Sequence, residues 1–147
     1  MKYFEDFPVG FSLTTSTVTL SEADIIAFAR EHDPQPFHID PEAAADTVYG
    51  GVIASGFQTL IAGFKLWLAE GGWAEASMGS PGLDELRWLR PVRPGAVLRM
   101  TATVVASRPS SKSADRGYTT VDHVISDETG AAVMTYRGVH MLKRRPS

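Results

Sequence analysis

The chain has 147 residues, a formal net charge of −3 and no cysteine. This length fits one domain, residues 1–147, and the missing cysteines exclude both a disulfide framework and a thiolate nucleophile. The weakly acidic charge predicts no nucleic-acid partner. An acidic N-terminus and the lack of a long apolar run predict a cytoplasmic protein that does not interact with a membrane.

The first predicted elements are a strand and a helix. Residues 12–19 are rich in Thr and Val, a composition typical of a strand with one polar face. Ser21, followed three residues later by Asp24, forms a capping-box pattern at the start of a helix. We expect this helix to be short and to extend through Arg30.

A proline-rich segment follows and should form an ordered loop. Asp33 and Gln35 each precede a proline, and a residue in that position is disfavoured in the helical region. Asp40 then has the character of a helix N-cap, because a proline follows it at the first helical position. We therefore predict a loop over residues 33–39 and one short helical turn after Asp40.

The next segment predicts a helix that is hydrophobic on nearly every side. Ser55 is a candidate N-cap, residues 56–69 would form the helix, and the two glycines at 71–72 would end it. Apolar side chains occupy almost all directions around this helix. Such a helix is expected to be wrapped by the rest of the protein.

The C-terminal half changes to the period of two that is typical of strands. Strands are predicted at residues 83–90, 97–107, 118–126 and 131–142, joined by turns and one polar loop. Consecutive strands with short connections favour an antiparallel sheet over a doubly wound one. Together with the N-terminal strand, these segments predict an α+β fold in which a five-stranded, twisted antiparallel sheet curls around the apolar helix.

The densest group of ionisable residues lies in the proline-rich segment. Asp33 and His38 could hold and deprotonate a water molecule and deliver a proton, as hydration of an unsaturated thioester requires. The reaction also needs a donor for the developing oxyanion, and the amide of Gly56 is the candidate because it begins a helix and glycine admits close approach. An extended path would separate Asp33 from His38 by roughly 15 Å, so the segment must turn back.

Two other interpretations of this segment remain open from the residue types alone. Asp before Pro often only initiates a turn, and a lone His near Phe often only packs and forms a hydrogen bond. A metal site built from His32, Asp33, His38 and Asp40 matches no standard ligand spacing, so no metal is predicted.

Residues 33–40, Asp-Pro-Gln-Pro-Phe-His-Ile-Asp, resemble the catalytic segment of the MaoC-like dehydratases, which include the (R)-specific enoyl-CoA hydratases. Three further segments in the same order are similar to that family: residues 3–10, Ala-Ser-Gly at 54–56, and Leu-Arg-Pro-Val-Arg-Pro-Gly at 89–95. Together the four segments span most of the chain.

The resemblance implies a hot-dog fold and a homodimer or dimer of dimers, with each site near the subunit boundary. It implies that Asp33 and His38 activate the water and shuttle the proton, while the Gly56 amide polarises the thioester carbonyl. The substrate would be a thioester of coenzyme A or of an acyl carrier, and no further cofactor is implied. The chain departs from the hydratases at Gln35, where Asn is usual, and at Ser55, where His is usual.

Other residues are candidates for substrate contacts. Gln35, Phe37 and Ser55 lie close in sequence to the proposed catalytic residues. Basic residues around the turn at 91–95 and in the polar loop could meet the phosphates of coenzyme A, among them Arg90, Arg93 and Lys112, although most such charges are simply solvated surface.

The tryptophans and the remaining histidines are interpreted as structural. Trp67, Trp73 and Trp88 are expected in the core or at a dimer contact, because aromatic side chains mainly supply buried area. His123 and His140 lie within predicted strands and are expected in hydrogen-bonded structural places.

We therefore predict a hydro-lyase of fatty acid metabolism that reversibly adds water to a 2-enoyl thioester and gives a 3-hydroxyacyl thioester. A thioesterase on the same fold is the alternative, but such enzymes often carry a carboxylate on the central helix and residues 56–69 contain none. A non-catalytic acyl-binding partner subunit is the third class, suggested by the departures at Gln35 and Ser55.

Overall fold

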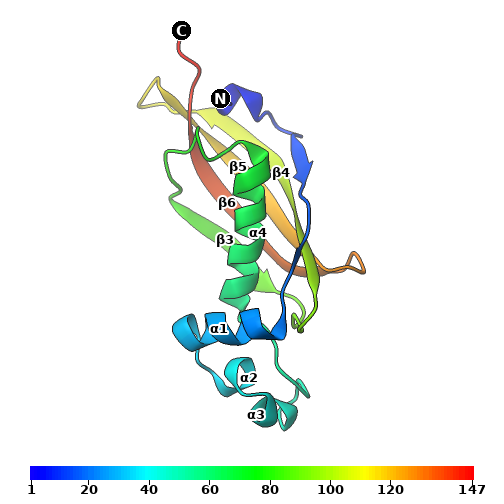
Figure 1. Ribbon diagram of the computed structural model, residues 1–147. Coiled ribbons are helices and arrows are strands. Elements are labelled where there is room, and N and C mark those ends of the chain that lie inside the picture. The colour runs from blue at the N-terminus through cyan, green and yellow to red at the C-terminus, as the bar shows by residue number, and fades with distance from the viewer.

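The protein, described by a computed structural model over residues 1–147, is built on a curved antiparallel sheet with one long helix against its inner face (Figure 1). The four longest strands are β3 (Gly82–Trp88), β4 (Val97–Pro109), β5 (Arg116–Ser126) and β6 (Ala132–Lys143). They lie in the order β4-β5-β6-β3, and every neighbouring pair is antiparallel. The predicted α+β class and antiparallel sheet are confirmed.

The N-terminal strand is interrupted, so the sheet has six strands rather than the five predicted. β1 (Ser12–Thr14) and β2 (Val18–Thr19) pair with different parts of β4. Between them, the Met100 amide donates to the Thr15 hydroxyl, and the Ser16 amide donates to the carboxylate of Glu70 at 2.9 Å. The Thr15 amide still donates to the Met100 carbonyl, but the two side-chain hydrogen bonds interrupt the ladder and divide the predicted strand in two.

A helix follows β2 and crosses one end of the long helix (Figure 1). This helix, α1 (Glu22–His32), begins with the predicted capping box: Ser21 Oγ accepts from the Asp24 amide, and the Asp24 carboxylate accepts from the Ser21 amide. It ends at His32, two residues after the predicted end at Arg30.

Two very short helices continue from α1. α2 (Pro36–Ile39) replaces part of the predicted loop, because Pro36 begins a helical turn instead of an extended path. α3 (Pro41–Ala45) has the predicted cap, with Asp40 Oδ1 accepting from two amides of its first turn. A 3-10 turn, η1 (Phe4–Asp6), lies near the N-terminus.

The long helix α4 (Gly56–Gly71) ends two residues later than predicted, where Gly72 takes a left-handed conformation with a φ of 74°. The expectation that this helix is wrapped on every side is wrong for the single chain. The sheet covers one side only, and Phe57, Ile61 and Phe64 on the open side are 54, 45 and 38% exposed. No helix, α4 included, is both long enough and apolar enough to cross a bilayer.

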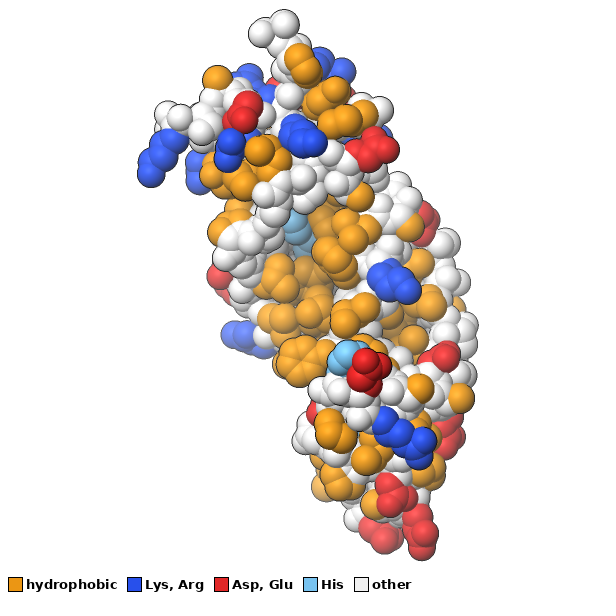
Figure 2. All heavy atoms as spheres, turned by 60° about the vertical axis from the view of Figure 1, so that its left-hand side comes forward, with side chains coloured by type: hydrophobic (Ala, Val, Ile, Leu, Met, Phe, Trp, Pro, Cys, Tyr) orange, Lys and Arg blue, Asp and Glu red, His pale blue; other side chains and the backbone are white.

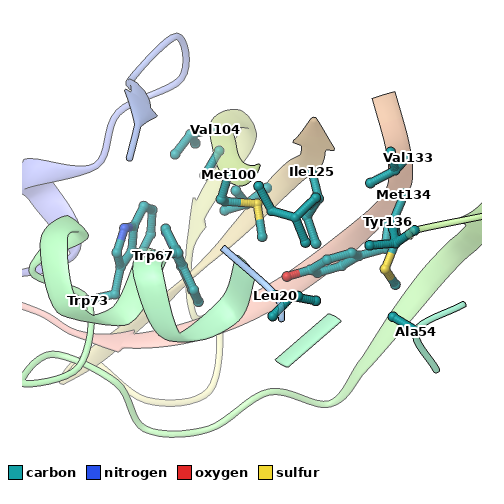
Figure 3. Packing of buried hydrophobic residues seen from close by; sticks show 14 of the residues in the cluster. Leu20, Ala54, Trp67, Trp73, Met100, Val104, Ile125, Val133, Met134 and Tyr136 are labelled. Atoms are coloured by element: carbon teal, nitrogen blue, oxygen red, sulfur yellow. The ribbon is translucent and has the colours of Figure 1, made fainter. Parts of the chain in front are cut away.

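The core lies between α4 and the inner face of the sheet (Figure 3). Alternate residues of β4, β5 and β6 are buried there, among them Met100, Ile125 and Tyr136. Trp67 of α4 and Trp73 of the following loop join them, with ring centroids 5.0 Å apart, as the sequence predicts. These side chains belong to a single core of 21 buried hydrophobic residues. The helix α4 and the strands that position the site therefore pack around the same core.

Candidate active site

Asp33 and His38 meet at the end of α1, where the chain reverses direction. Asp33 caps the C-terminus of α1, and its amide donates to the Ala29 carbonyl. The two prolines then lead into α2, whose single turn brings His38 back, so that His38 Nε2 lies 3.2 Å from Asp33 Oδ2. The reversal that the sequence required is therefore present, and a helical turn supplies it.

The His38 ring is held in one orientation by its second nitrogen. Nδ1 lies 2.6 Å from the carbonyl oxygen of Ile53, which can only accept a hydrogen bond, so Nδ1 donates. The residue is 4% exposed, and the ring of Phe37 packs against the imidazole edge-on. Nε2 is therefore the nitrogen that faces Asp33 and is available to exchange a proton.

The Asp33 carboxylate accepts two further hydrogen bonds. Gln35 Nε2 donates to Oδ1 and Ser55 Oγ donates to Oδ2, both at 2.7 Å. Burial raises the pKa of this carboxyl, but the hydrogen bonds from Gln35 and Ser55 outweigh burial and hold the pKa below its usual range. The two departures from the hydratase pattern, Gln35 and Ser55, thus both act on the ionised carboxylate.

The pair opens into a pocket of about 420 Å³. Five predicted site residues line it together: Asp33, Gln35, Phe37, His38 and Gly56. The rest of the lining is mostly apolar and comes mainly from α4, the end of β3 and the turn that follows β3, for example Phe57, Trp88 and Val92. Residues between α3 and α4 and one residue of β6 complete it: Tyr49, Ile53, Ala54 and Val133. Figure 2 shows hydrophobic side chains around a hollow on this side of the molecule, with a histidine and an acidic side chain at its lower end.

Gly56 meets Trp88 at this pocket. A Cβ on residue 56 would overlap the indole Nε1 and Cε2, so the close approach requires glycine. Gly56 is the first residue of α4, and its amide has no acceptor within the helix, which leaves it available to a ligand. Trp88 was expected in the core or at a dimer contact. The core is wrong, because the residue is 49% exposed and lines the pocket, and the dimer contact stays a prediction.

An irregularity in β3 explains why the strand pattern does not reveal Trp88. The register between β3 and β6 shifts between Asp84 and Arg87, and Glu85 adopts a φ of 52°. A bulge of this kind re-aims the side chains that follow it. The alternation of the predicted strand therefore does not indicate on which side Trp88 lies.

Arg93 and Lys112 do not line the pocket. Arg93 lines a neighbouring cavity of about 230 Å³ together with Asp127 and Glu128. Lys112 lies in the connection between β4 and β5, at the end of the sheet opposite α2 and α3 (Figure 1). The basic residue that does line the pocket is Arg90, in the turn after β3.

The four residues considered for a metal do not come together. His32 lies 3.6 Å from Glu31 on α1, and Asp40 caps α3. Only Asp33 and His38 of that set share the pocket, and no group of three His, Cys, Asp or Glu side chains with the arrangement of a metal site forms in the structure.

A curved antiparallel sheet that holds one long helix is the hot-dog fold, as the sequence predicts, and solved structures of this fold match the chain. The chain belongs to the MaoC-like family: the family described as "MaoC like domain" matches residues 7–125.

Similarity to individual proteins supports this membership. The crystal structure of a MaoC-like dehydratase from Rhodospirillum rubrum matches with a TM-score of 0.92 and 34% identity over all of both chains. An uncharacterised protein of Bacillus subtilis, YdeM, is 34% identical over 105 residues, 71% of this chain and 74% of that protein. An (R)-specific enoyl-CoA hydratase of Rhodospirillum rubrum is 30% identical over 122 residues, 76% of each chain. The family thus includes both hydratases and proteins without an assigned activity.

Proposed function

We propose that the protein is a hydro-lyase that reversibly adds water across the C2–C3 double bond of a 2-enoyl thioester and gives a 3-hydroxyacyl thioester. One observation carries the proposal: Asp33 and His38 lie 3.2 Å apart in a pocket that also contains the first residue of α4. The similarity to an (R)-specific enoyl-CoA hydratase supports an (R)-3-hydroxyacyl product and a place in fatty acid metabolism.

The reaction begins with a water molecule shared by the pair. The carboxylate of Asp33 and Nε2 of His38 each accept a hydrogen bond from it. The pair takes one proton from the water as the water oxygen bonds to C3 of the substrate. The C2–C3 π electrons move toward the thioester carbonyl, and a proton then returns from the pair to C2. The same steps in reverse remove water.

The negative charge that develops on the thioester oxygen needs a fixed donor. The amide of Gly56 points out of the start of a 16-residue helix, and the helix dipole adds partial positive charge there. No acidic residue lies in the first turn of α4 to oppose it. A donor already in place is worth most in the transition state, where the charge is largest.

The pocket suits an acyl thioester, and the reaction requires no cofactor besides the coenzyme A or acyl carrier that the substrate brings. Gln35 and Phe37 line the pocket as substrate contacts, while Ser55 acts through Asp33. Arg90 at the pocket and Arg93 in the adjoining cavity are the candidates for contacts with the phosphates of the carrier. Lys112 is not, because it lies at the other end of the sheet.

A thioesterase is not favoured, because α4 offers no carboxylate to the pocket. The one acidic residue of the helix is Glu70, near its far end. Its carboxylate accepts from the amide and the hydroxyl of Ser16, at 2.9 and 2.8 Å. No other acid of the helix is available to attack a carbonyl or a water.

The open face of α4 supports a homodimer or a dimer of dimers. β3 pairs only with β6, so its other edge is unpaired. Phe57 and Phe64 on α4 and Leu83 and Trp88 on β3 are all more than one third exposed beside this edge. A second copy would cover these side chains and pair the strand edge. Light scattering that finds only monomer at micromolar concentration would contradict the dimer.

The test of the proposed reaction compares variants within one segment. Asp33→Asn and His38→Gln keep the size of each side chain but remove its ability to exchange the proton, and each should lower the hydration rate of 2-enoyl-CoA by about 10²-fold or more. Asp40→Asn and His32→Gln are matched controls, because neither residue lines the pocket and Asn also caps helices. Both controls should retain the wild-type rate.

Two results would contradict the proposal. The first is unchanged turnover in both the Asp33 and the His38 variants. The second is wild-type protein that binds acyl thioesters of several chain lengths without hydrating any enoyl form, which would favour the non-catalytic acyl-binding class.

A further inference from the structure

We propose that His140 binds a hydroxyl group carried by the acyl chain of the substrate, well beyond the reacting carbons. The inference rests on the proposed hydration reaction and names its substrate class, a 2-enoyl thioester of about twelve carbons with a hydroxyl group at its far end. Three observations support it: the apolar surface that leads to the imidazole, the position of the ring, and one nitrogen that has no partner.

An apolar trough leads away from the pocket between α4 and β3. The helix packs mainly on β4 and β5, and the sheet continues past the helix through β6 to β3. Exposed hydrophobic side chains stand on both sides of the trough, Phe57 and Phe64 on α4 and Leu83 on β3. Figure 2 shows the hollow extending from the histidine and acid at its lower end to a second histidine farther up. A surface of this kind suits an alkyl chain.

The upper histidine is His140, the more exposed of the two histidines on the strands. His140 is 8% exposed and His123 is 1% exposed, while the other two histidines lie on α1 and α2 at the lower end of the molecule (Figure 1). The His140 ring packs on Trp67 of α4, with centroids 4.7 Å apart. A Cβ on Gly138 would lie 2.8 Å from His140 Nε2 and 3.3 Å from Leu83 Cδ2, so the ring lies beside β3. The imidazole therefore lies where the core meets the trough.

One nitrogen of His140 has no partner in the protein. Its Nε2 lies 3.3 Å from Nε2 of His123, so one of the two rings donates to the other. Nδ1 of His123 is sealed in the core without a partner. Nδ1 of His140 also has no partner, but it is not sealed in this way, so it is the nitrogen that the trough exposes. A polar atom in a residue this buried is expected to have a partner, and a ligand in the trough would supply one.

A hydroxyl group fits either arrangement of the histidine proton. If His123 donates to His140, then Nδ1 of His140 carries a proton and donates to the ligand; if His140 donates, its Nδ1 can only accept. A hydroxyl group can both donate and accept, so it satisfies Nδ1 in both cases. A carboxylate suits the site less, because burial lowers the pKa of His140 to about 4 and the ring is neutral near neutral pH.

The length of α4 sets the length of the acyl chain. Trp67, on which His140 packs, lies three turns after Gly56, about 16 Å along the helix axis. An extended chain advances about 1.2 Å per bond, so about 13 bonds connect a thioester carbonyl at Gly56 with a hydroxyl group at His140. A twelve-carbon acyl chain with a hydroxyl group on its last carbon has this length.

The kinetic test compares two substrates that differ only in the hydroxyl group, dodec-2-enoyl-CoA and 12-hydroxydodec-2-enoyl-CoA. The wild type should show a KM about fivefold lower for the hydroxylated substrate, as one neutral hydrogen bond would give, with a similar kcat. His140→Phe keeps an aromatic ring against Trp67 and should lose this preference. His123→Phe changes only the sealed partner and should retain it. Equal KM values for the two substrates in the wild type would overturn the proposal.

A spectroscopic test requires no turnover and uses the wild-type protein. Protein labelled with ¹⁵N in its histidines is titrated with two saturated analogues, dodecanoyl-CoA and 12-hydroxydodecanoyl-CoA. Only the hydroxylated analogue should shift the Nδ1 resonance of His140. The resonance is assigned by its loss in His140→Phe, or by the loss of the other buried ring in His123→Phe if the first variant does not fold. Equal shifts with both analogues, or tighter binding of an analogue that ends in a carboxylate, would overturn the proposal.

The two tests also separate this proposal from the hydratase function. If the wild type hydrates no enoyl thioester but the hydroxylated analogue shifts His140 Nδ1, the proposed reaction fails and the binding role stands. If both substrates are hydrated with equal KM values and Nδ1 does not shift, the reaction stands and the binding role fails. A wild type that hydrates only short enoyl thioesters and binds neither analogue likewise keeps the reaction and overturns the role of His140.

Discussion

Ser55 joins Asp33 to the start of α4. Its hydroxyl donates to Asp33 Oδ2 at 2.7 Å and accepts from the amide of Phe57 at 3.3 Å. The same side chain therefore caps the helix and holds the carboxylate. The group that handles water and the helix start that carries the Gly56 amide are consequently fixed relative to one another.

Ser55→Ala should affect stability and pH dependence together. Loss of the cap should lower the free energy of unfolding by about 1 kcal/mol. Loss of the hydrogen bond should raise the pKa of Asp33 toward its usual value, because one of the groups that lower it is gone. The acid limb of the pH–rate profile should then move to higher pH, whereas Ser55→Thr should retain the wild-type profile.

The direction of the change in stability with pH follows from the ionised carboxylate of Asp33. A carboxyl whose pKa is lowered in the folded state adds stability above its unfolded pKa, and this stability is lost as the pH falls through the folded value. Ser55→Ala should therefore show a smaller loss of stability on acidification than the wild type. An acid limb and an acid unfolding curve that both match the wild type would contradict this account of Ser55.

Gly63→Ala should destabilise the protein although alanine favours helices. The new Cβ would lie 2.6 Å from Ile125 Cδ1 and 3.0 Å from Met100 Cε, inside the core. Overpacking costs about 1 to 3 kcal/mol, which exceeds the gain of up to about 1 kcal/mol in helix propensity. Urea unfolding should show the loss, and Ile125→Val in the same chain should recover part of it. A stabilised Gly63→Ala protein would contradict the close packing at this position.

Gly56→Ala should displace the Trp88 indole, because the added methyl group would occupy the same space. The variant should be less stable than the wild type, and removing the indole with Trp88→Ala should restore most of that loss. Additive losses of stability in the two single variants would mean that the residues are not in contact.

Two buried histidines should make the fold sensitive to acid. Burial and the neighbouring His140 lower the pKa of His123 to about 3, and burial lowers the pKa of His140 to about 4. Below pH 6.5 the unfolded chain takes up protons on both residues while the folded protein does not. The free energy of unfolding should therefore fall between about pH 6.5 and pH 4, by up to about 1.4 kcal/mol per pH unit for each histidine.

His123→Phe should roughly halve this slope. The ring can still stack on Tyr136, as His123 does at 4.4 Å between centroids, but one of the two titrating groups is gone. Urea midpoints at several pH values measure the slope. His32→Gln, at a half-exposed position on α1, is the control for loss of a histidine. A slope equal to that of the wild type would contradict the assignment to the buried pair.

Local signals made most elements predictable. The caps at Ser21, Asp40 and Ser55 act on amides within three residues, so the starts of α1, α3 and α4 follow from the sequence. The break between β1 and β2 does not, because it depends on Ser16 bonding to Glu70, 54 residues away. The open face of α4 was also not predictable. Hydrophobic residues indicate that a face is buried, but not whether the sheet of the same chain or a second subunit buries it.

The same division applies to the site. Asp33, His38 and Gly56 were predictable because their segments carry recognisable patterns, and the structure brings all three to one pocket. Trp88 was not, since the bulge at Glu85 decides where its ring lies. The positions of basic residues depend on how distant connections are arranged in space, and for this reason Lys112 lies far from the pocket.

The hydrogen bond between His38 and the Ile53 carbonyl has a stereochemical consequence for the proposed reaction. With Nδ1 engaged, the imidazole cannot rotate away, and its reactive nitrogen stays 3.2 Å from Asp33. The Asp33 carboxylate and the His38 imidazole then face the same side of a planar substrate. Hydration in deuterium oxide should accordingly place the isotope at C2 and the hydroxyl at C3 on one face of the former alkene, a syn addition visible in the proton coupling constants of the product.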